Sequence, residues 1–205
     1  MTELGLRERK KQETRRRITG VAIELFAEHG FESVPVADIA RAADVSTATV
    51  FNYFPVKEDL IYDGMASFND DLLAAVRDRS GSTTVVAAFR DHALQPRGVL
   101  ADPASPVLES LGRVARIVRD SPSLQARERA EADRAILELR GLLVDELGDD
   151  LRAWAVASAL VGVTRGMARE VQAAAAEGRI GKAFAKKLLA SAAAALDVVE
   201  AGLAG

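Results

Sequence analysis

Prolines and glycines divide this chain into stretches that each carry apolar residues at helical spacing. In the first stretch an apolar residue recurs every three or four positions before Gly30, at Ile18, Val21, Ala22, Leu25 and Phe26. This spacing places the stripe on one face of an α-helix. All six prolines fall at boundaries of such stretches, where a missing N–H and a fixed φ do least harm. The pattern therefore favours a helical protein.

This division predicts an all-α fold of about nine helices with no strand. After a first helix that ends near Gly30, helices are expected over residues 36–43, 47–53, 57–79, 84–94, 107–119, 122–147, 150–177 and 182–202. The helix over 57–79 has its own apolar stripe, formed by Ile61, Met65, Phe68, Leu72 and Val76. A break near residue 57 separates a three-helix N-terminal domain, residues 1–57, from a larger helical domain, residues 58–205.

Residues 36–54 hold two short helices joined by a tight turn, which is the pattern of a helix-turn-helix. Asp44 occupies the turn, where glycine is commoner, and aspartate tolerates a positive φ better than most residues. Val45, Val50 and Phe54 are expected to be buried, and Ser46 is expected to cap the second short helix. The residues left facing outward are Thr47, Ala48, Asn52 and Tyr53.

Such an outward surface suits the major groove of DNA. Threonine can bond to several base edges, alanine can meet a thymine methyl group, and asparagine is suited to adenine. Tyr53 and Lys57 are better placed for phosphates, which fix register without reading sequence. Residues 1–20 add seven basic residues against three acidic ones, a local charge of 7 − 3 = +4 in a chain of net charge −3. A basic end indicates an anionic partner, although a solubilising tail would carry the same charge.

The composition offers little of the chemistry that an enzyme needs. The chain has no cysteine and only two histidines, His29 and His92, which are far apart. No acidic cluster has metal-ligand spacing, and residues 178–183, GRIGKA, lack the spacing, the hydroxyl and the preceding strand of a phosphate loop. We therefore expect no metal, no cofactor and no catalytic site.

The N-terminus lacks the apolar core of a secretory signal, and the longest apolar run, residues 153–163, is shorter than the roughly 20 residues that span a bilayer. A cytoplasmic protein with no membrane segment is expected.

Residues 15–61, RRRITGVAIELFAEHGFESVPVADIARAADVSTATVFNYFPVKEDLI, resemble the DNA-binding domain of the TetR family of bacterial transcriptional regulators. The stretch contains L-F-x-x-x-G-F, D-I-A, V-S-x-x-T-x-F-x-Y-F and K-E-x-L in that order. The resemblance implies that Thr47, Ala48 and Asn52 face bases and that Tyr53 and Lys57 contact phosphates of a double-stranded operator. The full set of DNA-contacting positions that it implies is Arg15, Arg16, Ala37, Ser46, Thr47, Ala48, Thr49, Phe51, Asn52, Tyr53 and Lys57.

The sequence departs from the family pattern at several of these positions. Pro35 and Val36 stand where hydroxyl residues commonly cap the second helix, and Ala37 stands where some members carry a base-reading arginine. Phe51 takes the place of a tyrosine, so a phosphate contact through that hydroxyl is lost. We therefore expect the basic arm and Lys57 to supply more of the affinity. The same departures motivate an alternative, a helical interaction module with weakened or lost DNA binding.

For the larger domain, the resemblance implies a homodimer built on the helices over 150–177 and 182–202, and hence a near-palindromic operator. Both helices are rich in alanine, valine and leucine, and Gly162 and Gly166 would let backbones approach closely. Tight packing within one chain would use the same small residues.

The resemblance also implies a small-molecule effector that releases the protein from DNA, with repression as the commoner mode. Residues 116–140 resemble the subgroup of mycofactocin-type regulators, which implies a bulky lipophilic or acyl ligand. Candidate ligand contacts are Phe89, Arg113, Ile117, Leu139, Trp154, Ser158, Val161 and Arg165. Core packing and ordinary ion pairs would account for the same residues.

Overall fold

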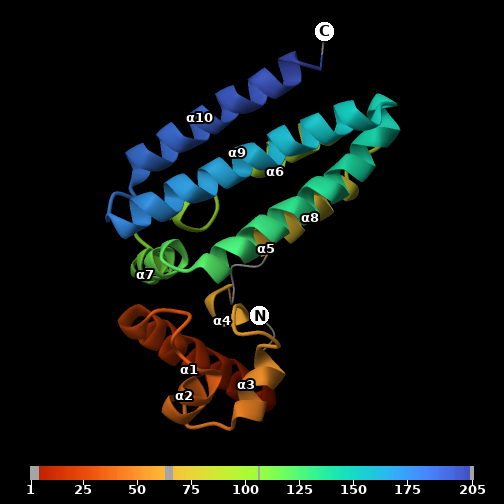
Figure 1. Ribbon diagram of the computed structural model, residues 1–205. Helices are drawn as coiled ribbons and strands as arrows, with labels where there is room; N and C mark the ends of the chain where they lie inside the picture. The colour runs from red at the N-terminus through yellow and green to blue at the C-terminus, as the bar shows by residue number, and fades with distance from the viewer. Residues whose placement is uncertain (1–4, 63–66, 106, 204–205) are drawn as a thin grey trace. The chain divides into compact units, whose positions relative to one another are not determined.

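A computed structural model describes residues 5–62, 67–105 and 107–203, and every regular element in these ranges is a helix (Figure 1). The all-α prediction is confirmed. The α-helices are α1 (Leu6–His29), α2 (Val36–Ala42), α3 (Thr47–Tyr53), α4 (Asp59–Tyr62), α5 (Ser67–Arg77), α6 (Val85–Ala93), α7 (Val107–Arg119), α8 (Pro122–Leu147), α9 (Asp150–Ala176) and α10 (Lys182–Ala201). A short 3₁₀ helix, η1 (Gly98–Leu100), lies in the predicted proline-rich loop.

The predicted helix over 57–79 corresponds to two described helices, α4 and α5. Residues 63–66, including Met65 of its apolar stripe, lie outside the described residues, as does the side chain of Phe68. The stripe positions Ile61, Leu72 and Val76 are buried as expected.

The chain forms two compact units. The first contains α1 to α4 together with Arg116–Arg127, which is the corner between α7 and α8; the second contains α5, α6, most of α7 and α8, and α9 and α10. The corner therefore packs with the N-terminal helices although it lies about sixty residues further along the chain than the predicted domain boundary at 57.

Polar contacts tie the α7–α8 corner to the N-terminal helices. Ser121 is almost fully buried, and its hydroxyl donates to Glu32 over 2.7 Å and accepts from the N–H of Leu124 over 3.2 Å, which caps α8. Burial alone would raise the pKa of Glu32, but the hydrogen bonds from Ser121 and Ser123 outweigh burial and lower it. Arg127 also pairs with Asp59 at 2.7 Å. Two carboxylates therefore bind this corner, Glu32 at its middle and Asp59 at its C-terminal end.

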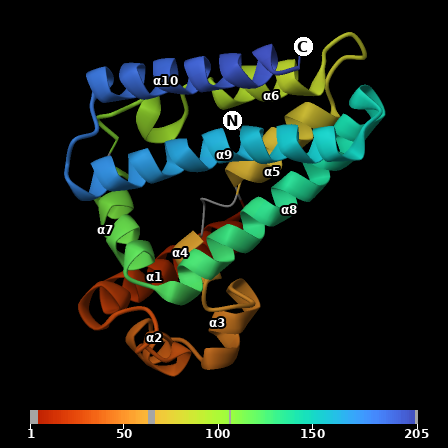
Figure 2. The same cartoon turned by 45° about the horizontal axis from the view of Figure 1, so that its top comes forward.

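The larger apolar core of the second unit is formed by residues of α5, α6, α8, α9 and α10. Fully buried members include Phe89, Leu139, Leu143, Leu160 and Leu196. Helices α9 and α10 lie side by side along much of their length, as both views show (Figures 1 and 2). In the part of the chain that the structure describes, no helix is both long and apolar enough to cross a membrane.

Helices α7 and α9 approach each other so closely that only glycine fits at position 112. A Cβ atom added to Gly112 would lie 2.7 Å from the carbonyl oxygen of Ala175, which is backbone and cannot rotate away. Beside this contact, Val99, Ala174, Ala175 and Ile180 form a small second core.

Gly112→Ala is expected to destabilise the protein although alanine favours helices. The clash should cost about 1–3 kcal/mol, as overpacking does, against a gain of about 1 kcal/mol in helix propensity. Gly141→Ala in α8 is the matched control, since an added Cβ there meets no atom within 4 Å and should stabilise slightly. Thermal unfolding of both variants checks this, and a Gly112→Ala variant as stable as Gly141→Ala would contradict it.

Candidate nucleic-acid interface

The turn between α2 and α3 has the backbone conformation that the sequence predicts. Asp44 has a φ of 51°, and it is the one non-glycine residue with positive φ in the described ranges. The N–H groups of Asp44 and Val45 donate to the carbonyl oxygens of Arg41 and Ala40 over 3.2 and 3.0 Å. These bonds close the turn, so α3 leaves α2 in a fixed direction.

Buried side chains anchor α3 to the rest of its unit. Val50 and Phe54 are each 1% exposed, and they belong to a core that includes Ile18 of α1 and Ile39 of α2. Val45, in contrast, is only half-buried, because it sits at the end of the turn and not on a helix face. The burial predicted for Val50 and Phe54 is confirmed, and that predicted for Val45 is only partial.

The opposite face of α3 lies open. Thr47, Ala48 and Asn52 are exposed, as the sequence predicts, and Tyr53 is half-buried. Phe51 is 46% exposed, an unusual position for a large apolar ring on a surface helix. Because the other face of α3 is buried, the helix offers a short surface of hydroxyl, methyl, aromatic and amide groups to a partner.

Ser46 and Thr49 cap the start of α3. The hydroxyl of Ser46 accepts from the N–H of Thr49 over 3.0 Å, and the two side-chain oxygens lie 2.8 Å apart. The predicted N-cap is confirmed. Contacts from these two hydroxyls to DNA stay a prediction.

The start of α2 has the features that the sequence departures predict. Pro35 occupies the cap position, and no side chain there accepts a hydrogen bond from the helix. Ala37 is exposed, and Arg41 on the same helix pairs with Asp38. Helix α2 therefore lacks a capping hydroxyl at its start, and the charge of Arg41 is paired within the helix.

The basic N-terminal segment differs from the predicted arm, because it is helical from Leu6 onward and continuous with the apolar stripe of α1. Ten of the eleven residues at 7–17 are lysine, arginine, glutamate or glutamine, which are good helix formers, so the segment favours a helix over an extended arm. Arg15 is half-buried, with its guanidinium 4.8 Å from the ring centre of Phe54, whereas Arg16 is exposed. The two neighbouring arginines therefore point to different sides of α1.

Lys57 has intramolecular contacts that the sequence did not predict. Its ammonium group donates to the carbonyl oxygen of Phe31 and lies 4.4 and 5.5 Å from the ring centres of Phe31 and Phe26. Burial lowers the pKa of Lys57 more than the carboxylates of Glu32 and Glu58 raise it. Lys57 therefore stabilises the segment that follows α1 through its contacts with Phe31 and Phe26. Its contact with a DNA phosphate stays a prediction.

Lys57→Ala is expected to lower the free energy of unfolding and to weaken binding to all DNA sequences alike. The loss of a hydrogen bond from a charged donor should cost about 1.5 kcal/mol, and the cation–π contacts add to this. Urea unfolding and DNA titration measure the two effects. Lys186→Ala, at an exposed position on α10, is the control, and equal stability of the two variants would contradict the stabilising role.

The structure does not gather the predicted ligand contacts into one place. Phe89, Leu139 and Val161 meet in the core of the second unit, and Ser158 and Arg165 are half-buried on α9. Trp154, in contrast, is 45% exposed under the guanidinium of Arg140 at 5.7 Å. Of the two remaining candidates, Arg113 pairs with Glu109, and Ile117 is buried in the first unit. Among the described residues no group of three or more histidine, aspartate and glutamate side chains could hold a metal ion.

The N-terminal helices match a known protein family. Residues 18–62, which span the stripe of α1, the turn, α3 and α4, match the model of the bacterial regulatory proteins of the tetR family. The HTH-type transcriptional regulator TcmR of Streptomyces glaucescens is 26% identical over 172 residues, 81% of this chain and 76% of that protein. MftR of Mycobacterium tuberculosis, named for mycofactocin biosynthesis, is 51% identical over 49 residues, 24% of this chain and 25% of that protein. This second match is too short to test a resemblance over the larger domain.

The same fold occurs in a solved structure. NalD of Pseudomonas aeruginosa, the secondary repressor of the MexAB-OprM multidrug efflux pump, aligns with 89% of this chain and 95% of its own, with a TM-score of 0.53 and 20% identity. The helix-turn-helix geometry, the family match and these relatives agree. Residues 18–62 therefore carry the helix-turn-helix domain of the tetR family of bacterial regulatory proteins.

Proposed function

We propose that the protein is a homodimeric repressor that binds a near-palindromic operator and leaves it when a small molecule binds. The observation that carries the DNA-binding part is the surface of α3, where Thr47, Ala48, Phe51 and Asn52 are exposed on a helix whose other face is buried. A helix held in this way fits the major groove, which is wide enough to admit it. Asn52 would read adenine, and Ala48 or Phe51 would meet thymine methyl groups.

The surface of α9 and α10 supports the homodimer. On α9 a row of small residues is exposed, comprising Ala155, Ala159, Gly162 and Gly166, and Cβ atoms added at the two glycines would meet no atom within 4 Å. Leu151 of α9 and Val198 of α10 are 82% and 73% exposed. Leu151 lies four positions before Ala155 and therefore continues the row, so the exposed apolar residues of α9 are contiguous. Small residues allow close approach between helices, and contiguous exposed apolar patches mark interaction surfaces. A two-fold dimer would read half-sites about 34–36 Å apart.

An effector would act through the second unit. A ligand that binds one arrangement of the dimer more tightly than the other would shift the spacing of the two recognition helices and weaken DNA binding. Phe89, Leu139 and Val161 form the apolar surroundings that a lipophilic or acyl molecule would need to enter. Ser158 and Arg165 remain the proposed polar contacts.

Titration of the protein against the DNA upstream of its own gene, at several salt concentrations, tests the proposal. A regulator should bind one segment specifically and lose affinity steeply as salt rises, because binding releases counterions from the phosphates. Binding that is absent, or that does not change with salt, would favour the helical interaction module instead.

A further inference from the structure

Helix α10 has a buried face and an exposed face that differ in their spacing. On the buried face lie Ala185, Leu188, Ala192 and Leu196. The exposed face carries a row at alternating intervals of four and three positions, comprising Ala183, Lys187, Ala190, Ala194, Asp197 and Ala201. An average interval of 3.5 residues is the repeat by which two helices stay in contact along their whole length. We call this row the α10 seam.

The α10 seam is complementary to a reversed copy of itself. Lys187 lies three positions before Ala190, and Asp197 lies three positions after Ala194; a further alanine lies four positions beyond each charge. A second α10 that runs antiparallel, centred midway between Ala190 and Ala194, would therefore place alanine opposite alanine and lysine opposite aspartate. A parallel copy in register would place like charges together, which is unfavourable.

The two charges of the α10 seam need partners of opposite sign. Asp197 pairs with Arg90 of α6 at 2.7 Å, yet 64% of its side chain is exposed, so its carboxylate can accept from a second cation. The small residues that form the exposed row of α9 carry no charge. Packed against that row, Lys187 and Asp197 would lose water without gaining a partner, which costs free energy. The charges therefore favour α10 of a second copy over its α9.

We propose that α10 packs antiparallel against α10 of a second copy, with Ala190 opposite the partner's Ala194 and Lys187 opposite the partner's Asp197. The proposal rests on the homodimer proposed above and adds the register of its interface and the residues that select the partner. The alanines allow the two helices to approach closely. The two symmetric ion pairs fix the register and disfavour chains that lack the same pattern of charges.

Charge substitutions test the choice of partner. Lys187→Glu and Asp197→Lys each place like charges together at two positions of the homodimer, so each variant alone should dissociate at least roughly tenfold more readily than wild type. An equimolar mixture of the two should form a heterodimer of near wild-type affinity, because both contacts are then attractive. Lys182→Glu, an exposed position of α10 outside the seam, is the control and should dissociate like wild type. Sedimentation measures the dissociation constants, and a mixture no tighter than the separate variants would overturn the proposal.

Cross-linking tests the register independently of charge, in a chain that has no cysteine of its own. A mixture of Ala190→Cys and Ala194→Cys chains should form a covalent heterodimer on oxidation, because the two positions face each other within reach of a disulfide. Ala190→Cys alone should cross-link far more slowly, since its two copies are offset by four residues, or about 6 Å along the helix. A faster cross-link between Ala190→Cys and Ala159→Cys chains would place α10 against the partner's α9 and overturn the proposal.

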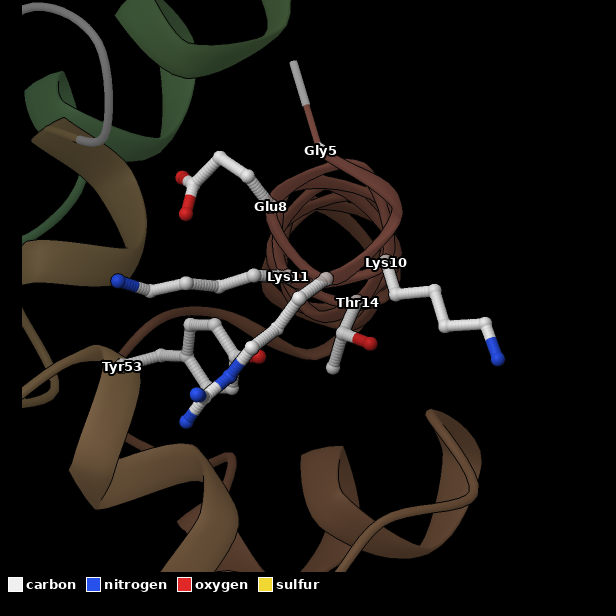
Figure 3. Close-up of a pocket in the computed structure, with 7 residues that line it drawn as sticks. Gly5, Glu8, Lys10, Lys11, Thr14 and Tyr53 are labelled. Carbon is white, nitrogen blue, oxygen red and sulfur yellow. The ribbon is translucent and has the colours of Figure 1, made fainter.

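Failure of the register differs from failure of the proposed function. A wild type that stays monomeric and binds no operator would refute the proposed dimeric repressor, whereas a wild-type dimer that fails both tests would refute the α10 register alone. The charge substitutions leave the first unit unchanged, including the basic cleft between α1 and Tyr53 (Figure 3), so a change in DNA affinity would follow from assembly. The mixture of Lys187→Glu and Asp197→Lys should therefore also restore the operator affinity that each variant loses.

Discussion

Asn52→Ala is expected to flatten the protein's preference among operator sequences without changing its stability. Asn52 is exposed on α3, so its truncation should alter the free energy of unfolding by no more than about 0.5 kcal/mol. The amide can pair with both the N6 and N7 positions of adenine, and such a contact contributes about 1–3 kcal/mol of discrimination against the wrong base. Two half-sites double this effect in a dimer.

The measurement is a titration of wild type and variant against the operator and against operators changed at single base pairs. Asn69→Ala on α5 is the control, since it makes the same substitution on the second unit. The variant should bind the intact operator more weakly and lose the distinction at one base pair of each half-site. A uniform loss across all sequences would show that Asn52 positions the protein and does not read a base.

Local sequence patterns were sufficient to predict the helix-turn-helix. The stripe of α1, the positive φ at Asp44 and the cap at Ser46 each depend on residues within a few positions of one another. The outward face of α3 follows from them, because the burial of Val50 and Phe54 leaves only one orientation for Thr47, Ala48 and Asn52. This is why the recognition surface could be predicted from the sequence.

Contacts between distant residues could not be predicted in the same way. Glu32 meets Ser121, and Asp59 meets Arg127, across 89 and 68 positions, and nothing in the pattern of charges pairs them. The contact between Lys57 and Phe31 spans 26 positions, and the sequence pattern does not predict it either. The first two pairs hold the α7–α8 corner against the N-terminal helices, so the division of the chain into units depends on contacts that local periodicity does not predict.

The ligand candidates were uncertain for a different reason. Helix α9 is apolar around much of its circumference, so periodicity does not say which side faces the core. The structure buries Ala153, Ala157 and Leu160 and leaves Trp154 and Ala155 exposed. Trp154 therefore fits an interaction surface better than the interior of a ligand site.

Ala159→Glu is expected to convert the proposed dimer to a monomer and to abolish most operator binding. Ala159 lies on α9 in the exposed row with Ala155, Gly162 and Gly166, so the substitution should leave the monomer folded. In a two-fold dimer the same position occurs on both chains, and two carboxylates would be buried without partners in a tightly packed interface, which is strongly unfavourable. Light scattering measures the mass of the variant in solution.

The effect on DNA should be large because two linked recognition helices bind far more tightly than one. Joining two binding modules raises affinity by about 10²–10⁴ without any new contact, and a monomer loses this gain. Ala130→Glu on α8 is the matched control, an exposed alanine on another long helix that should keep both mass and affinity. If the Ala159→Glu protein stays dimeric and binds its operator like the control, the exposed faces of α9 and α10 do not form the dimer interface.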